Sequence, residues 1–129
     1  MASILLVEDA SDIRYIVELL LQNVGYTVIS VNDGVDAVQR AQYEPPDLIV
    51  MDLALPRLDG WEATRQLKEW ESTRHIPVLA FTAHALPDEI ERAKAVGCAA
   101  VITKPFEITT FLDTIDRLLH TPHERSVGS

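Results

Sequence analysis

The residues best suited to chemistry stand directly after short apolar or β-branched runs. Glu8 and Asp9 follow the first run, Asp52 a second, Thr82 a third, and Lys104 the last. Three carboxylates brought close together repel one another, so they raise each other's pKa or require a cation. Lys104 supplies one positive charge and a divalent ion supplies two more, which together balance the carboxylates. Because the donors are hard oxygens, Mg²⁺ fits this set better than zinc.

These side chains match the needs of phosphoryl transfer, where catalysis is mainly positioning and charge neutralisation. We assign the attack on phosphorus to Asp52, charge neutralisation to Mg²⁺ with Lys104, and a hydrogen bond to Thr82. Asp9 would be the main metal ligand, with Glu8 beside it. Taken singly, each residue has an ordinary explanation: a helix cap, a plain strand-end threonine or a solvated lysine. The combination is specific because every member follows a predicted strand.

Strand-like and helix-like segments alternate five times along the chain. Continuous apolar or β-branched runs predict the strands, and apolar residues at helical spacing predict the helices. Gly25 and Gly97 are typical of positions that end a helix, and Ser11 or Asp12 is expected to cap the first helix. We expect strands over residues 4–7, 26–31, 48–51, 78–81 and 99–103, and helices around residues 11–24, 35–41, 60–70, 86–96 and 108–119.

This alternation predicts an α/β fold with a parallel sheet and helices on both faces. Right-handed crossovers restrict the topology, and we expect a doubly wound, flavodoxin-like sheet of five strands in the order 2-1-3-4-5, with five helices. Ligands of such sheets bind at the carboxyl edge, where the strand order reverses. That point lies between the first and third strands, so Glu8, Asp9 and Asp52 would flank it.

Several apolar side chains are expected in the core. Cys98 is interpreted as a small packing residue rather than a redox sensor, Trp70 as core-facing, and Trp61 as partly so. The buried faces of the first and last helices are predicted to consist of Ile13, Ile16, Val17, Leu20, Leu21 and Val24, and of Ile108, Phe111, Leu112, Ile115 and Leu119.

The bulk composition fits a small globular protein. The chain has 129 residues and a formal charge of -9, and we expect one domain over residues 1–120 and a polar tail over residues 121–129. The acidic balance argues against direct nucleic-acid binding, which normally needs a basic patch. No segment approaches the roughly 18 apolar residues of a membrane span, and no basic region typical of a signal peptide is evident. We therefore expect a cytoplasmic protein without membrane contact.

Four segments carry a resemblance to a known family: Leu6-Val7-Glu8-Asp9, Met51-Asp52-Leu53-Ala54-Leu55-Pro56 with Asp59-Gly60, Phe81-Thr82-Ala83, and Lys104-Pro105-Phe106. At this spacing the chain, from Ile4 to about Leu119, closely resembles the response-regulator receiver family, in particular its single-domain, chemotaxis-regulator-like members. The resemblance implies a receiver of a two-component phosphorelay. It would switch protein–protein interactions with an unidentified downstream target, and no output domain is evident.

The resemblance also implies how the site works. Asp52 would accept phosphate from a phosphohistidine on a histidine kinase or histidine phosphotransfer protein, with Mg²⁺ as the cofactor. The chain would not be an enzyme acting on another substrate, but a phosphoacceptor that assists its own phosphorylation and dephosphorylation. The implied residues are Glu8, Asp9, Asp52 and the backbone carbonyl of Ala54 for the metal, Thr82 and Lys104 for the phosphoryl group, and Pro105 after a cis peptide bond.

Three positions bear on regulation. In the family, the switch pairs the hydroxyl at the end of the fourth strand with an aromatic residue three positions before the lysine. Here that position is Val101, which has no ring to rotate, so either Thr82 and its loop act alone or another surface changes. Ala54 and His84 are predicted to tune the lifetime of the phosphate. Small Ala54 leaves the path of water open, and His84 either screens that path or is an ordinary exposed loop residue.

Two other functions stay open. A binding module could keep this fold and signal without phosphate, which would suit Val101. An aspartyl phosphatase or phosphotransferase generally has a second acid two residues after its nucleophile, where this chain has Ala54. A dinucleotide-binding domain is disfavoured because no G-x-G-x-x-G follows the first strand. The segment Thr82-Ala83-His84-Ala85 is similar to segments of hybrid kinases, so an origin in a larger kinase is also compatible with the sequence.

Overall fold

The computed structural model describes residues 2–83 and 86–120. The predicted tail over residues 121–129 lies outside the described residues. The strands form one parallel sheet in the order β2-β1-β3-β4-β5, which confirms the predicted topology. The elements are β1 (Ser3–Val7), α1 (Ser11–Val24), β2 (Thr27–Val31), α2 (Gly34–Tyr43), β3 (Leu48–Asp52), α3 (Gly60–Glu69), β4 (Val78–Thr82), α4 (Pro87–Val96), β5 (Ala100–Thr103) and α5 (Ile108–His120).

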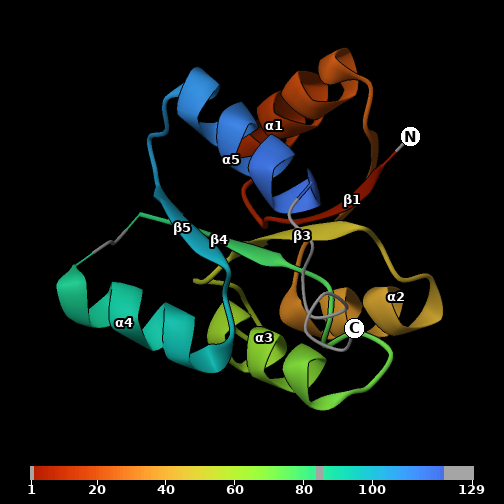
Figure 1. Ribbon diagram of the computed structural model, residues 1–129, viewed down its shortest axis with the longest axis vertical. Coiled ribbons are helices and arrows are strands. Elements are labelled where there is room, and N and C mark those ends of the chain that lie inside the picture. The colour runs from red at the N-terminus through yellow and green to blue at the C-terminus, as the bar shows by residue number, and fades with distance from the viewer. Residues whose placement is uncertain (1, 84–85, 121–129) are drawn as a thin grey trace.

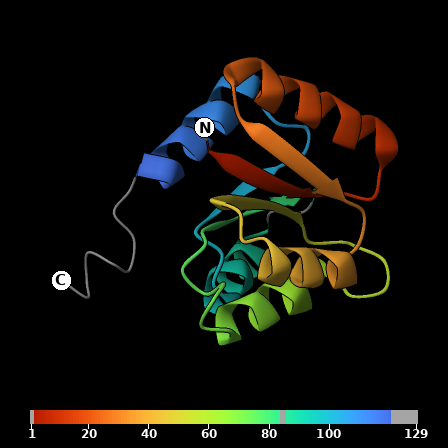
Figure 2. The ribbon, with the colours of Figure 1, turned by 90° about the vertical axis from the view of Figure 1, so that its right-hand side faces the viewer.

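The molecule has three layers, with α1 and α5 on one face of the sheet and α2, α3 and α4 on the other (Figure 1). The same layers are visible from the side in Figure 2. Successive strand residues point to opposite faces, so Leu6 packs beneath α1 and α5 while its neighbours Leu5 and Val7 pack beneath α2 and α3. Every residue of β3 and β4 is buried, as expected for central strands covered on both faces.

Three phenylalanines anchor α5 to the sheet. The ring centroids of Phe81 and Phe106 lie 5.2 Å apart, those of Phe81 and Phe111 5.8 Å, and those of Phe106 and Phe111 4.7 Å. Phe81 and Phe111 are fully buried. Aromatic pairs at these separations contribute about 0.5–1.5 kcal/mol beyond their buried area. This cluster fixes the chain that runs from Lys104 into α5.

The helix ends agree with the sequence in most places. Gly25 and Gly97 have φ values of 114° and 113°, the left-handed conformation that ends α1 and α4. Asp33 caps α2 by accepting a hydrogen bond from the backbone N–H of Asp36. The cap predicted for α1 is wrong, because its N-cap is Ala10, which makes no side-chain cap bond. The predicted starts of the second and last strands were each one residue early.

Some predicted core residues are exposed. Trp70 is 54% exposed, because α3 ends at Glu69 and Trp70 adopts an extended conformation with φ -92° and ψ 133°. Ile16 and Val24 of α1 are also exposed, and so is Ile108 at the start of α5. Only Val17 and Leu21 of α1 are fully buried, so the helix touches the sheet along a narrower stripe than its apolar face.

Other packing predictions hold. Trp61 is half-buried, with the guanidinium carbon of Arg92 4.2 Å from its ring centroid. Cys98 is buried, and burial raises the pKa of its thiol to about 11, which suits a packing residue. None of the helices in the described ranges has the length and apolar character needed to cross a membrane.

Candidate functional site

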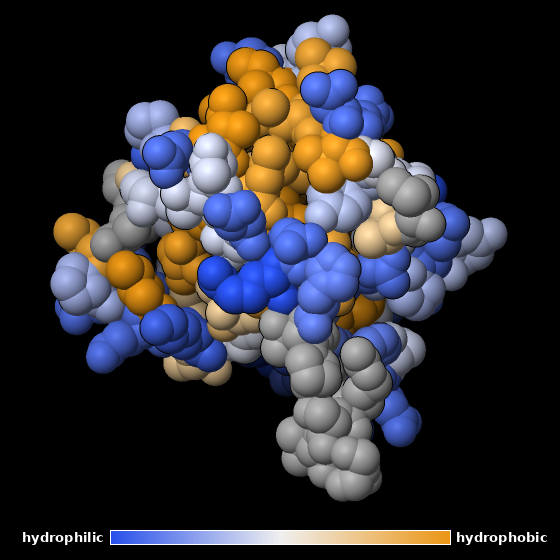
Figure 3. Space-filling view, turned by 45° about the horizontal axis from the view of Figure 1, so that its top comes forward, coloured by the Kyte–Doolittle hydropathy of each residue, from blue (hydrophilic) through white to orange (hydrophobic). Residues whose placement is uncertain are grey.

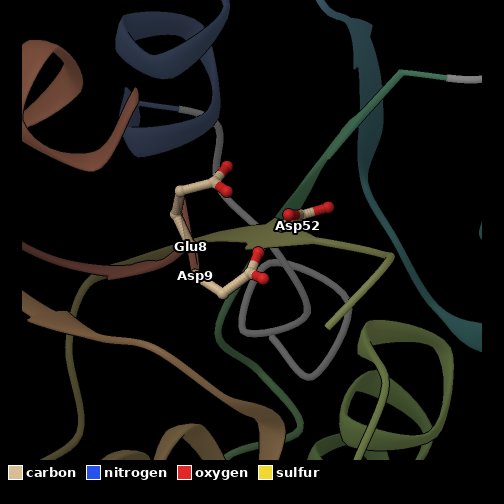
Figure 4. A group of neighbouring side chains, drawn as sticks. All are labelled: Glu8, Asp9 and Asp52. Carbon is tan, nitrogen blue, oxygen red and sulfur yellow. The ribbon is translucent and has the colours of Figure 1, made fainter. Parts of the chain in front are cut away.

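The candidate site lies at the carboxyl edge of the sheet, where the strand order reverses. β1 is flanked by β2 on one side and β3 on the other, and Val7 pairs with Met51. Because parallel strands end at the same edge, the residues after Val7 and Met51 emerge side by side. Figure 4 shows Glu8 and Asp9 leaving the end of β1, with Asp52 at the end of β3.

Three carboxyl groups meet at this point. One oxygen from each of Glu8, Asp9 and Asp52 lies within 4.8 Å of the other two. Glu8 is fully buried, Asp52 is 4% exposed and Asp9 is exposed. The donors are all hard oxygens, and the exposed carboxylate of Asp9 is open to solvent. This arrangement fits Mg²⁺, which binds a few carboxylates and retains other ligands.

Lys104 joins two of the carboxylates. Its Nζ donates to Glu8 Oε1 at 2.8 Å and to Asp52 Oδ2 at 3.2 Å. The second oxygen of Glu8 accepts from the backbone N–H of Ala10 at 3.1 Å. Lys104 is the last residue before the cis peptide bond to Pro105, the isomer that the resemblance implies. One ammonium group therefore compensates two acids from different strands.

The local charges shift two pKa values. Burial raises the pKa of Glu8, and the hydrogen bond from Lys104 opposes this shift. Burial by itself would lower the pKa of Lys104, but its hydrogen bond to Glu8 and the charge of Asp52 outweigh burial, so the pKa is raised. Lys104 therefore stays positively charged at neutral pH.

The remaining contacts hold Asp52 and Thr82 in place. Asp52 Oδ1 accepts from the backbone N–H of Ala54 at 3.0 Å, so both of its oxygens have a donor. Thr82 ends the neighbouring strand β4 and is buried, and its carbonyl accepts from the N–H of Lys104 at 2.7 Å. The structure thus brings Glu8, Asp9, Asp52 and Lys104 together and places Thr82 at the adjacent strand end.

The described residues include two of the three positions that were predicted to bear on regulation, Ala54 and Val101. Ala54 is exposed in the segment between β3 and α3. Val101 pairs with Ala80 across β4 and β5 and packs half-buried against the core cluster beneath α2, α3 and α4. His84, the other residue predicted to tune phosphate lifetime, lies outside the described residues.

Two arginines near the site were not predicted from the sequence. Arg14 Nη1 donates to the backbone carbonyl of Glu8 at 2.9 Å, which ties α1 to the turn that carries the acids. Arg57, in the segment after Asp52, pairs with Asp33 and Asp36 at the start of α2. A contact of Arg14 with the site was predictable in principle, because Arg14 lies near the start of α1, shortly after Glu8 and Asp9. Arg57 gives no such signal, because 24 residues separate it from Asp33.

Known proteins resemble this chain in both sequence and fold. The response regulator receiver domain family matches residues 4–116. The polar-differentiation response regulator DivK of Brucella ovis is 39% identical over 117 residues, which is 91% of this chain and 95% of that protein.

Two solved structures extend this likeness. One is the receiver domain of a sensor histidine kinase from Pseudomonas aeruginosa PAO1, with a magnesium ion coordinated in its active site cleft. It has a TM-score of 0.87 at 36% identity and covers 93% of this chain and 98% of that one. The chemotaxis response regulator CheY4 of Vibrio cholerae has a TM-score of 0.86 at 33% identity, over 92% of this chain and 98% of that one. These likenesses confirm the flavodoxin-like architecture.

Proposed function

This chain belongs to the response regulator receiver domain family of two-component signalling, and we propose that within it Asp52 is the phosphoacceptor. The phosphoryl group would come from a phosphohistidine on a histidine kinase or phosphotransfer protein, the partners with which receiver domains interact. The observation that carries the proposal is the ammonium group of Lys104, which bridges Asp52 Oδ2 and Glu8 Oε1 beside the exposed carboxylate of Asp9.

The chemistry follows from the contacts of Asp52. A carboxylate oxygen of Asp52 forms a bond to phosphorus while the phosphorus–nitrogen bond of the phosphohistidine breaks, and the imidazole nitrogen keeps the electron pair. Lys104 already lies 3.2 Å from Asp52 Oδ2, so it can move onto a phosphoryl oxygen without crossing the site. The hydroxyl of Thr82 would donate to another phosphoryl oxygen. The N–H of Ala54 holds the carboxylate in orientation.

Magnesium has a natural place in this scheme. Glu8, Asp9, Asp52 and the backbone carbonyl of Ala54 would hold it. When bound, Mg²⁺ supplies positive charge that offsets the charge developing on the phosphoryl oxygens. Because Glu8 is fully buried and already hydrogen-bonded to Lys104, Asp9 is the more accessible of the two acids from β1.

The chain would act on its own phosphate rather than on a separate substrate. Ala54 is exposed and carries only a methyl group, so it leaves an approach for the water that hydrolyses the acyl phosphate. The receiver would therefore assist both the gain and the loss of its phosphoryl group. Its output would be a change in protein–protein contacts.

The surface beside the acceptor suits a helical partner. Tyr15, Ile16 and Leu19 of α1 are exposed, and Figure 3 shows apolar side chains gathered over the part of the molecule where α1 and α5 lie. We propose that the helix bearing the phosphohistidine docks on this α1 face, which begins three residues after Glu8. A hollow of about 500 Å³ continues the face toward the site and is lined by Ile13, Phe81, Ala83, Lys104, Pro105 and Phe106.

Acetyl phosphate provides the simplest test. The protein is incubated with acetyl phosphate and Mg²⁺, and phosphorylation is followed by intact mass. We expect one phosphoryl group on the unchanged protein, none on Asp52→Asn, and normal labelling of Asp113→Asn, which removes an exposed carboxylate on α5. Labelling of Asp52→Asn would overturn the assignment. A module that signals without phosphate would show no change in amide chemical shifts when beryllofluoride and Mg²⁺ are added.

A further inference from the structure

The segment between β3 and α3 is held to α2 by one arginine. Arg57 Nε donates to Asp33 Oδ2 at 2.9 Å, and Arg57 Nη2 lies 2.7 Å from the same oxygen. The same nitrogen lies 3.4 Å from Asp36 Oδ1. The segment that Arg57 anchors, residues 53–59, is the one that carries Ala54 into the candidate site.

The anchor on α2 is itself fixed. Asp33 is 8% exposed, and its other carboxylate oxygen, Oδ1, caps α2 by accepting from the N–H of Asp36 at 2.8 Å. The hydrogen bond from Arg57 lowers the pKa of Asp33, so its carboxylate stays charged. The Arg57 side chain is 57% exposed and that of Asp33 only 11%. Because the cap already fixes Asp33, the pair loses less side-chain entropy than one between two exposed side chains.

The backbone of Arg57 is also unusual. Its φ of 63° is the one positive value at a non-glycine residue in the described ranges. This left-handed conformation costs free energy for a residue with a Cβ atom. The contacts of the guanidinium with α2 therefore hold the turn in a conformation that the arginine backbone would not choose alone.

Close backbone packing limits movement on both sides of the turn. A Cβ atom at Gly34 would lie 1.9 Å from the carbonyl oxygen of Leu58, and one at Gly60 would lie 2.2 Å from that of Asp52. The segment is thus confined between the first residue of α2 and the end of β3. Because the backbone is packed tightly at both ends of the segment, we expect a displacement of Arg57 to shift Ala54 and Asp52 as well.

We propose that Arg57, through its ion pair with Asp33, is a positioning residue that sets the backbone of Ala54 for magnesium binding and phosphoryl transfer. Arg57 acts at a distance, by holding the turn whose Ala54 N–H contacts Asp52 Oδ1 and whose Ala54 carbonyl would be a ligand of the metal. The inference rests on the function proposed above. Loss of the pair loosens the site without removing any group that contacts the phosphoryl oxygens.

The test measures Mg²⁺ affinity of the unphosphorylated protein by titration calorimetry. Arg57→Gly suits the left-handed turn and so should fold, which urea denaturation checks. We expect its Mg²⁺ dissociation constant to rise about threefold to tenfold, less than the 10–100-fold loss typical when a direct support of a ligand is removed. Arg57→Lys should recover part of the loss. Arg65→Ala, which removes an exposed arginine with ion pairs of its own on α3, should bind Mg²⁺ normally.

A second variant tests the route through α2. Asp33→Asn keeps a side-chain oxygen for the helix cap but removes the charge, so it should weaken Mg²⁺ binding like Arg57→Gly, and the double variant should be no weaker than either single one. An unchanged dissociation constant in Arg57→Gly, or additive effects in the double variant, would overturn the inference. Failure of the proposed function looks different, because Asp52→Asn would then still be labelled by acetyl phosphate.

Discussion

Lys104 is expected to hold the acceptor site together electrostatically. Replacing Lys104 with methionine leaves the fully buried carboxylate of Glu8 and the 4% exposed Asp52 without a counter-charge. Removing one partner of a buried pair typically costs about 3–5 kcal/mol. Because the Lys104 side chain is 17% exposed and water reaches the site beside Asp9, we expect the loss in free energy of unfolding to be about 2–3 kcal/mol without metal.

A double-mutant cycle separates this pair from general packing. Glu8→Gln removes one acid but leaves Lys104 paired with Asp52, so its cost should be about 1 kcal/mol. In the double variant the uncompensated Glu8 charge is gone, so the combined loss should fall short of the sum by about 1–2 kcal/mol. Urea denaturation in the presence of EDTA measures each value, provided that the denaturant slope stays constant.

The effect of Mg²⁺ on stability tests whether the loss in Lys104→Met comes from the missing charge. A bound cation replaces the missing ammonium charge, so Mg²⁺ should raise the urea midpoint of Lys104→Met more than that of the unchanged protein. Lys94→Met removes an exposed lysine from the last turn of α4 and should change stability by less than about 0.5 kcal/mol. Additive costs in the cycle, together with equal stabilisation of both proteins by Mg²⁺, would refute the electrostatic account of the site.

Three further predictions concern the scaffold. Because the Cys98 pKa is raised to about 11, its labelling by a thiol reagent should be slow at pH 8 and accelerate only above pH 10 or in urea. Rapid labelling of the folded protein at pH 8 would contradict its burial. Phe111→Ala should cost about 3–5 kcal/mol in urea denaturation, whereas Ile108→Ala, at an exposed position of the same helix, should cost less than about 1 kcal/mol; similar losses would show that the aromatic cluster is not what anchors α5. Gly34→Ala should lower the midpoint of thermal unfolding, since its Cβ would lie 1.9 Å from the Leu58 carbonyl oxygen; an unchanged midpoint would mean that the backbone can shift there without penalty.

The sheet edge was predictable because it follows from two local facts and one topological rule. Each of Glu8, Asp52 and Lys104 comes directly after or at the end of a strand, and parallel strands end at one edge. Right-handed crossovers then leave few strand orders. The sequence predicted that Lys104 supplies a positive charge near these acids, whereas its hydrogen bonds to Glu8 and Asp52 came from the structure.

Which apolar helix residues stay exposed was harder to predict. Helical periodicity shows which side of a helix faces the sheet, but not how wide a stripe of that side the sheet covers. Ile16 and Val24 belong to the apolar face of α1, yet they lie beyond the narrow stripe that touches the sheet. Trp70 was assigned to the core because its spacing continues α3, but the helix ends one residue earlier without a glycine to mark the end.

The Arg57–Asp33 pair shows a different limit. Asp33 precedes Gly34 and Arg57 follows Pro56, so both stand in turn-like segments where charged residues are common, and nothing in the sequence pairs one with the other. Their contact exists only because the segment after β3 folds back over the first residue of α2, where Gly34 meets the Leu58 carbonyl. Contacts of this kind follow from the packed loops rather than from the strand order.

Val101 bears on how a signal would leave the site, not on whether Asp52 could accept phosphate. Val101 is half-buried against the cluster beneath α2, α3 and α4, and a β-branched side chain has little rotational freedom. It cannot exchange a large buried position for an exposed one, as an aromatic ring can. Within the described residues, α4 contacts α3 through the guanidinium of Arg92, whose central carbon lies 4.2 Å from the ring centroid of Trp61 in the first turn of α3. Because α3 begins where the segment held by Arg57 ends, we propose this contact as a route by which a change at Asp52 would reach α4 without a rotating aromatic side chain.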